Sequence, residues 1–278
     1  MSALSSRRAR AFFHSSIGSL GILFGLALGG CSAGEAEAGQ DVSFEKSPDG
    51  VMLEGPLGEA AAKIVSEQLL DNGTLVVNSR GGSRDSARQI GATVARRNAT
   101  VDVNSSCFSA CALYLALPAS HVLVGRGATL LFHSTPELWV RLSRERPDLF
   151  GPDETARIRQ DLAMLKSDLI GRGVDPEILS CIDRASRPRE ETLRLSSDSQ
   201  ARRLGYTDDA TVTIRSEFDA VWLSPSVLKS FGADNLDISW SLSPTARPQY
   251  ESLKGLKIAW VDDPSQCQAA DGGVGADR

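Results

Sequence analysis

The run Val76-Val77-Asn78-Ser79-Arg80-Gly81-Gly82 is followed by Ser105-Ser106-Cys107-Phe108-Ser109-Ala110-Cys111 and later by Leu130-Leu131-Phe132-His133. Each run contains one part of an acyl-transfer site. A glycine pair can present a backbone N–H to an oxyanion, a serine can attack a carbonyl carbon, and a histidine can accept the serine proton. The three runs in this order predict acyl-transfer chemistry.

Alternating strand and helix patterns surround these runs. Strands are predicted at 51–55, 74–78, 100–104, 121–125, 129–133, 211–215 and 256–261, and helices at 58–71, 84–97, 109–117, 152–172, 176–184 and 225–231. Because strands alternate with helices, we expect an α/β fold with a parallel sheet core and right-handed βαβ units. His133 ends a strand pattern, and the active sites of open α/β sheets collect at the carboxyl ends of strands.

These residues and their spacing resemble the Clp protease proteolytic subunit and the wider Clp/crotonase superfamily. Ser109 lies 27 positions after Gly82, and His133 lies 24 positions after Ser109, which is similar to the spacing in that family. Residues 195–205 also look like the family's closing segment. The resemblance covers about residues 50–210 and implies a Clp/crotonase-type fold with serine hydrolase activity.

Ser109 has the surroundings of a nucleophile. It stands at the start of a predicted helix, where the Ala110 N–H can join the Gly82 N–H as a second oxyanion donor. Taken singly, the serine could be a helix cap, His133 a hydrogen-bonded core residue, and the glycines a tight turn. Together they favour a nucleophile, a general base and an oxyanion turn. Arg80 replaces the family's usual proline, but both glycines of the turn remain.

The sequence departs from the family at the position of the catalytic acid. The family's aspartate position falls on Leu193. Glu191, two residues earlier, faces the same way in an extended chain and is our first choice. Asp183, 50 residues after His133, matches the family's linear spacing and is our second choice. If neither carboxylate orients the imidazole, the site is a Ser-His dyad or a relic.

The N-terminus predicts a lipoprotein signal peptide. Three arginines precede an apolar core at 17–28, which is shorter than a transmembrane helix requires. The run Leu28-Gly29-Gly30-Cys31 resembles the bacterial lipobox, which implies a lipid on Cys31. The alternative is an ordinary signal peptide that contains a cysteine. Ser32 favours the outer membrane, by resemblance to Gram-negative sorting rules.

These patterns predict four regions along the chain. They are a signal peptide and lipobox at 1–31, a flexible linker at 32–48, a Clp/crotonase-like domain at 49–215, and a C-terminal extension of unknown role at 216–278.

Four cysteines remain beyond the lipobox: Cys107, Cys111, Cys181 and Cys267. An even number in an oxidising compartment suggests disulfides, with three possible pairings, and the alternative for the first two is buried apolar packing. We expect the first two to pair elsewhere if they pair, because a regular helix does not easily bridge residues four apart.

We expect no metal site and no cofactor. The mature chain has only His121 and His133, and neither adjoins a cysteine. His121 has no partner motif and is interpreted as structural or exposed.

The sequence as a whole predicts an exported, lipid-anchored serine hydrolase that faces the periplasm and acts on peptide or protein substrates. The net charge of −5 and the pI near 5.3 make nucleic acid an unfavourable partner. The region 152–184 matches the segment that the family uses for subunit contacts, which implies a possible homo-oligomer. Two alternatives are an inert Clp-like envelope lipoprotein that acts in binding or assembly, and a crotonase-type acyl-CoA enzyme. Export weighs against the second, because coenzyme A is cytoplasmic.

Overall fold

The computed structural model describes residues 42–47, 50–145, 147, 150–194, 210–238 and 241–267. All of them belong to one compact unit, Cys31–Arg278. The predicted signal peptide, the lipobox at Cys31 and the closing segment at 195–205 lie outside the described residues. Among the described residues, no helix has both the length and the apolar character that a membrane crossing requires.

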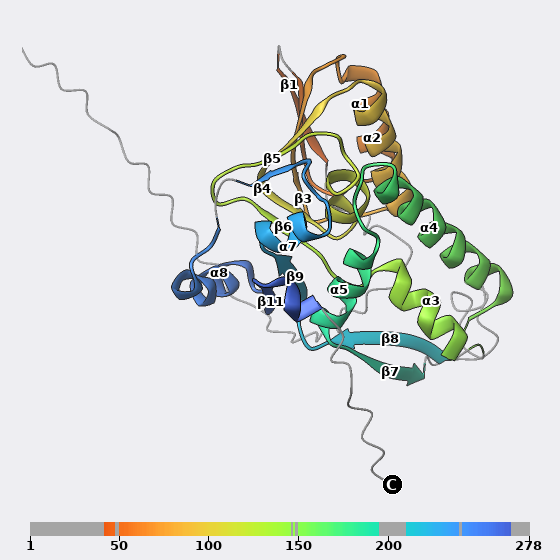
Figure 1. Ribbon diagram of the computed structural model, residues 1–278. Helices are drawn as coiled ribbons and strands as arrows, with labels where there is room; N and C mark the ends of the chain where they lie inside the picture. Colours follow the sequence, from red (N-terminus) through yellow and green to blue (C-terminus); the bar gives the residue numbers. More distant parts are fainter. Residues whose placement is uncertain are drawn as a thin grey trace, which may run out of the picture. The chain divides into compact units, whose positions relative to one another are not determined.

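The described chain is a mixed α/β fold built on a seven-stranded sheet (Figure 1). The strands run in the order β1-β2-β3-β4-β5-β10, and β6 also pairs with β4. Every pairing in this sheet is parallel except that of β1 with β2. The strand bounds are β1 (Ser43–Ser47), β2 (Gly50–Glu54), β3 (Thr74–Ser79), β4 (Thr100–Phe108), β5 (Val122–Val124), β6 (Thr129–Leu131) and β10 (Leu236–Ile238). The predicted α/β class with a parallel core is confirmed.

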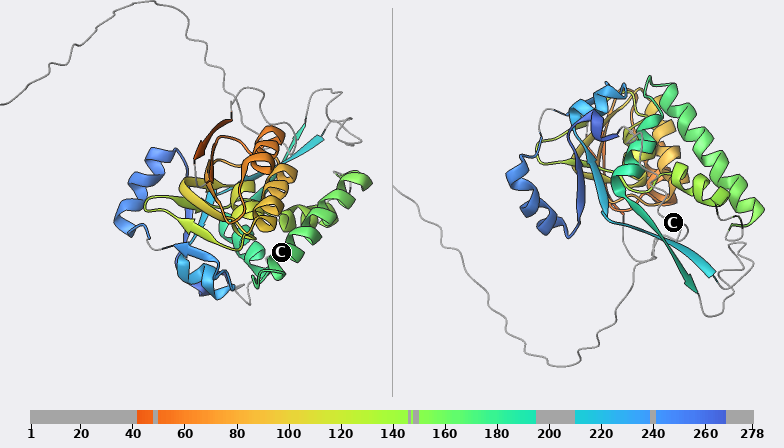
Figure 2. Two further views of the ribbon diagram at one scale, coloured as in Figure 1. Left: turned by 90° about the horizontal axis from the view of Figure 1, so that it is seen from above. Right: turned by 60° about the horizontal axis from the view of Figure 1, so that its bottom comes forward.

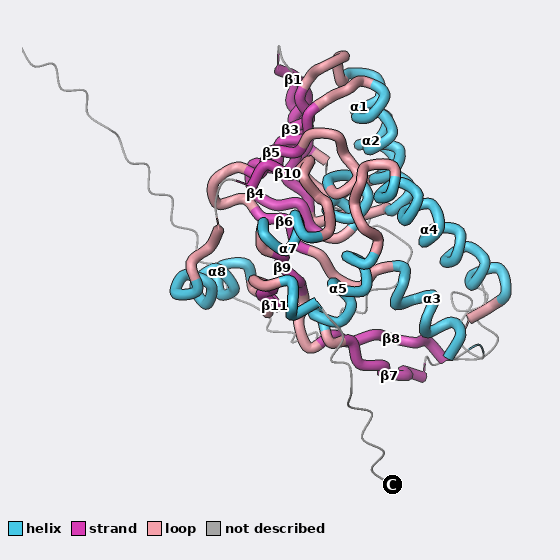
Figure 3. Tube along the Cα trace, viewed as in Figure 1, coloured by secondary structure: helices cyan, strands magenta, loops and turns pink. Residues whose placement is uncertain are grey.

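The strands are accompanied by helices, and Figure 3 draws the strands in magenta and the helices in cyan. The helices are α1 (Glu59–Gln68), α2 (Arg84–Arg96), α3 (Pro136–Glu145), α4 (Pro152–Ile170), α5 (Glu177–Ser186), α7 (Pro225–Ser230) and α8 (Arg247–Lys254), with a π-helix at Cys111–Ala116. Helices α1 and α2 lie side by side in the views of Figure 2, and α2 also contacts the π-helix. The aliphatic strand residues Leu53, Leu75, Val77, Val101 and Val103 are fully buried. Burial of this apolar surface is the main stabilising contribution to the core.

Residues at the N-termini of two helices stabilise the helix starts. The Ser83 side chain caps α2 by accepting a hydrogen bond from the Ser86 N–H at 3.3 Å. Helix α4 begins with Pro152 and carries Asp153 and Glu154 in its first turn, where the helix dipole favours acidic groups. This start is the one that the sequence predicts.

Strand β4 has two partners on the same side. Its first half, Val101–Val103, pairs with β5, and its second half, Ser106–Phe108, pairs with β6. Because β3, β4 and β6 are parallel neighbours, their carboxyl ends meet at one edge of the sheet. The three runs that predict acyl-transfer chemistry end at this edge.

A buried carboxylate joins three helices. The Asp161 side chain on α4 accepts hydrogen bonds from Arg84 at 3.0 Å, from Arg88 at 2.8 Å and from the Tyr114 hydroxyl at 2.7 Å. Arg84 and Arg88 lie on α2, and Tyr114 lies on the π-helix. Three donors compensate the desolvation of the carboxylate, so this network ties α4 to the helices that follow β3 and β4.

Residues after 216 are part of the main fold. Strand β10 extends the sheet next to β5, and β9 (Ala220–Leu223) pairs with β11 (Ile258–Val261) in a second, two-stranded sheet. Val221 of β9 exchanges two backbone hydrogen bonds with Phe132, at 2.9 and 2.7 Å. The predicted C-terminal extension therefore completes the core sheet and contacts the segment that leads to His133.

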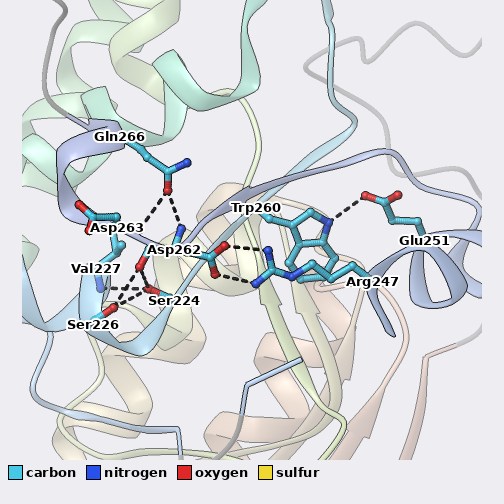
Figure 4. A network of polar contacts seen from close by, with 9 residues as sticks. All are labelled: Ser224, Ser226, Val227, Arg247, Glu251, Trp260, Asp262, Asp263 and Gln266. Carbon is cyan, nitrogen blue, oxygen red and sulfur yellow. Dashed lines mark hydrogen bonds and ion pairs between the residues drawn. The ribbon is translucent and has the colours of Figure 1, made fainter. Parts of the chain in front are cut away.

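Arg247 anchors α8 to the second sheet (Figure 4). Its guanidinium lies 4.8 Å from the ring centre of Trp260 and 5.7 Å from that of Trp222. Two of its nitrogens donate to the Asp262 carboxylate at 2.7 and 2.6 Å. Cation–π contacts and a bidentate ion pair together hold the helix in place.

Several expectations about secondary structure are wrong. The predicted linker overlaps β1 (Ser43–Ser47), because this polar segment gains an antiparallel partner in β2. Helix α3 (Pro136–Glu145) is not predicted, and the helix predicted at 109–117 is a π-helix of six residues. The strand predicted at 211–215 is confirmed as β8 (Ala210–Ser216), but β7 (Pro188–Arg194), its antiparallel partner in a separate sheet, is not predicted.

Candidate active site

The glycine turn follows the end of β3. Gly81 and Gly82 have φ values of +104° and +137°, a region that favours glycine. The Gly81 N–H donates to Ser79 Oγ at 3.1 Å, and the Gly81 carbonyl accepts from the Leu57 N–H at 2.7 Å. The Ser83 N–H donates to the Leu57 carbonyl at 2.8 Å. Among the residues that the structure describes, the Gly82 N–H has no acceptor and is available to a ligand.

Both positions of this turn are too crowded for a side chain. A Cβ on Gly81 would lie 2.8 Å from the Ser109 Cβ and 3.2 Å from the Ala110 nitrogen. A Cβ on Gly82 would lie 2.7 Å from the Leu57 carbonyl oxygen. The absence of side chains therefore lets the turn pack directly against Ser109 and Ala110.

Ser109 occupies a sharp bend between β4 and the π-helix. Its φ is +59°, a left-handed conformation that costs a serine on the order of 1–2 kcal/mol. The Ser109 N–H donates to the Leu131 carbonyl and its own carbonyl accepts from the Leu113 N–H, both at 3.0 Å. The next amide, the N–H of Ala110, has no acceptor among the described residues.

A disulfide spans the bend, which corrects the expected pairing of the cysteines. Cys107 and Cys111 are bonded to each other with their Cα atoms 5.2 Å apart, and Cys181 is bonded to Cys267. The expectation assumed one regular helix. Cys107 instead lies in strand β4, one residue before its end, and the left-handed Ser109 turns the chain back so that Cys111 reaches it.

His133 lies two residues beyond the end of β6 and contacts the serine. Its Nε2 is hydrogen bonded to Ser109 Oγ. The Phe108 ring meets the imidazole edge-on, with ring centres 5.2 Å apart. Burial lowers the pKa of His133 below its ordinary value, so the neutral form that can accept a proton is favoured near pH 7.

Asp183 contacts the neighbouring segment rather than the imidazole. Its carboxylate accepts from the Thr135 N–H at 2.8 Å and from the Thr135 hydroxyl at 2.6 Å. Burial raises the pKa of Asp183 to about 6. Our second choice for the acid therefore holds the chain two residues past His133, a contact that linear spacing does not reveal.

Glu191, our first choice, lies on β7 in the separate two-stranded sheet. Its side chain lies outside what the structure describes, so its role as the acid stays a prediction. Among the described side chains, the hydrogen bond of the His133 ring is the one to Ser109, and no carboxylate contacts it. The described site is a serine–histidine pair beside two backbone N–H groups.

The other candidate residues have simpler surroundings. His121 is exposed just before β5, and the described residues hold no cluster of three His, Cys, Asp or Glu side chains that could bind a metal ion. Sequence reasoning missed the roles of Phe108, Thr135 and Leu57. Leu57 acts through its backbone, which no side-chain pattern can indicate.

The pH dependence of serine acylation should report the buried imidazole. Because burial lowers the pKa of His133, the rate should rise with pH through an apparent pKa below 6.5 and then stay level to pH 8. The measurement is the rate of reaction with a fluorophosphonate at each pH. The His121→Ala variant should give the same profile. An apparent pKa above 7 would instead indicate a carboxylate close to the ring.

Comparison with known proteins finds similar chains among solved structures. No family model and no curated protein matches it. Among solved structures, it is similar to a ClpP1 mutant from Listeria monocytogenes at 17% sequence identity, over 48% of this chain and 77% of that chain, with a TM-score of 0.32. A likeness this distant does not establish a family, so membership of the Clp/crotonase superfamily stays a prediction from the residues.

Proposed function

We propose that this protein is a serine hydrolase in which Ser109 is the nucleophile and His133 is the general base. The observation that carries the proposal is the hydrogen bond between Ser109 Oγ and His133 Nε2 at the carboxyl ends of adjacent parallel strands. The glycine turn packed against Ser109 supports it, because Gly82 and Ala110 then have N–H groups available for an oxyanion.

These residues suffice for a balanced acyl transfer. Ser109 Oγ attacks a carbonyl carbon while its proton moves to His133 Nε2, and the carbonyl oxygen becomes an oxyanion. When the tetrahedral intermediate collapses, the imidazolium gives its proton to the leaving group. Water then attacks the acyl-serine while the imidazole takes a proton from it. As the bond to Ser109 Oγ breaks, the imidazolium returns that proton to Oγ, and the acid leaves.

We further propose peptide or protein substrates and an exported, lipid-anchored location facing the periplasm. The peptidase part rests on the resemblance of the three sequence runs to the Clp subunit. The export part is supported by the two disulfides, because such bonds persist in oxidising compartments.

An inert Clp-like envelope protein is the second candidate. The described surroundings of His133 favour it in one respect, since both oxygens of Asp183 accept hydrogen bonds from Thr135. A missing orienting acid can reduce turnover by about 10⁴-fold. A Ser-His dyad would still react with an activated phosphonate, so labelling separates a weak enzyme from an inert scaffold.

Labelling with a fluorophosphonate tests the proposal directly. We expect covalent attachment of one phosphonyl group, with Ser109 as the modified residue, and no attachment to Ser109→Ala. Ser106→Ala is the matched control, because Ser106 lies three residues away and donates a hydrogen bond to Asn78 Oδ1 at 3.0 Å. Labelling that persists in Ser109→Ala, or that is absent from the folded parent protein, contradicts the assignment.

Mass spectrometry of the mature protein tests the anchor. We expect an N-terminal Cys31 that carries two or three acyl chains, since each buried methylene adds about 0.8 kcal/mol to membrane binding. Cys31→Ala should abolish the added mass and release the protein from membranes. A mature N-terminus at another residue, without lipid, would contradict the predicted lipobox.

A further inference from the structure

The Cys107–Cys111 disulfide closes a covalent ring around the candidate nucleophile. The three residues inside the ring are Phe108, Ser109 and Ala110. Phe108 contacts the imidazole of His133, Ser109 is hydrogen bonded to it, and Ala110 has an N–H available beside the glycine turn. Every residue that the disulfide encloses therefore belongs to the site.

The backbone of Ser109 needs an external constraint. The described non-glycine residues with positive φ are Asn72, Asn98, Ser109 and Arg187. Asparagine adopts the left-handed region readily, and Arg187 ends helix α5, where that conformation is common. Ser109 has neither advantage. The disulfide keeps the two flanking Cα atoms 5.2 Å apart, which favours a tight reversal of the chain at this serine.

The size of the ring suits local positioning more than overall stability. The two cysteines are four positions apart in the sequence, whereas Cys181 and Cys267 are 86 apart. A disulfide restricts the unfolded chain less when the loop that it closes is shorter. Cys107 and Cys111 are also fully buried, so a reductant reaches them only when the structure opens locally. The bond is thus a permanent constraint rather than an exposed redox switch.

We propose that the Cys107–Cys111 disulfide is a positioning device for acyl transfer, which holds Ser109 in its left-handed conformation and aims Oγ at His133 and the Ala110 N–H at the oxyanion. It acts through these residues and does not touch the substrate. The catalytic part of this inference rests on the proposed function of Ser109.

The test compares two disulfide-free variants of the full chain. Cys107→Ala/Cys111→Ala removes the short ring, and Cys181→Ala/Cys267→Ala is the matched control that removes the long one. For each we would measure the maximal rate and half-saturating concentration of fluorophosphonate labelling, the amide hydrogen exchange of residues 107–113, and the thermal midpoint. Labelling is compared at a temperature where all proteins are folded.

The short-ring variant should label roughly 10–10²-fold more slowly at saturation, because a displacement of about 1 Å has an effect of this size. Its half-saturating concentration should change less than about threefold, since the binding surface is intact. A general loss of structure would instead change both the maximal rate and the half-saturating concentration. Exchange in residues 107–113 should speed up about tenfold or more, consistent with local opening. The control should label and exchange like the parent and show the larger fall in thermal midpoint.

Parental labelling and parental exchange in the short-ring variant would overturn the proposal. If the alanine pair does not fold, Cys107→Val/Cys111→Ala restores side-chain volume in the strand. Failure of both pairs to fold would also overturn it, because the ring would then be needed by the whole fold. If the parent is not labelled but exchange in 107–113 speeds up as expected, the conformational role stands and the proposed hydrolase function is what fails.

Discussion

Replacing His133 by alanine is expected to slow the acylation of Ser109 by roughly 10²–10⁴-fold, the usual contribution of a general base. His133 Nε2 is hydrogen bonded to Ser109 Oγ, and burial lowers the pKa of His133 so that the ring is neutral near pH 7. Without the ring, the serine proton has no acceptor among the described side chains that contact Ser109. The measurement is the rate of fluorophosphonate labelling under saturating conditions.

His121→Ala is the matched control, because that histidine is exposed outside the site. Its labelling rate should stay within about twofold of the parent, since the variant removes no group from the site. Thermal melts of both variants confirm that they are folded. A His133→Ala protein that labels at the parental rate would show that another group accepts the proton, and the serine–histidine pair would then be only a structural contact.

Removal of the Cys181–Cys267 disulfide is expected to lower the free energy of unfolding by about 4 kcal/mol. The bond joins α5 to the 3₁₀ turn Pro264–Cys267 across 86 positions. The chain-entropy model gives a stabilisation of about 4 to 5 kcal/mol for a disulfide that closes a loop of this size. This is about twice the stabilisation for a ring of five residues. For a domain of this length the thermal midpoint should fall by roughly 10 °C. Thermal unfolding of Cys181→Ala/Cys267→Ala under oxidising conditions measures the effect.

The comparison with Cys107→Ala/Cys111→Ala controls for the loss of sulfur atoms, since both pairs are buried. The long-range bond should have about twice the effect of the short one on the free energy of unfolding. An equal or smaller fall in midpoint for Cys181→Ala/Cys267→Ala would show that loop length does not govern the contribution of these bonds, for instance because the unfolded chain keeps residual structure.

Local patterns predicted the elements that lead to the site. Apolar runs ending near Ser79 and Leu131 form strands β3 and β6, and the amphipathic pattern after Gly82 forms helix α2. These predictions succeed because side-chain periodicity within one segment decides which face is buried. In contrast, β1 is a polar segment that becomes a strand only because β2 offers it an edge, which is a contact that no local pattern contains.

The spacing of Gly82, Ser109 and His133 predicted that these residues share a site. The structure brings Ser109 and His133 into hydrogen-bond contact and packs the glycine turn against the serine, because the three residues follow adjacent parallel strands. Their chemical roles stay proposals. The acid could not be chosen in the same way, since Asp183 accepts hydrogen bonds from Thr135, two residues past His133, and linear spacing does not distinguish these two positions.

The sequence by itself thus determined the α/β class and the order of the strands that lead to Gly82, Ser109 and His133, since these depend on the order and polarity of side chains along the chain. The end of β4 was not among these features, because the strand predicted at 100–104 continues to Phe108. Only the tertiary structure decided the conformation of Ser109, the pairing of Cys107 with Cys111 and the engagement of Asp183 by Thr135. These features depend on distances of a few ångströms between backbone segments. Such distances are set by how the strands and helices pack together. They cannot be inferred from the residue types and spacing within one segment of the chain.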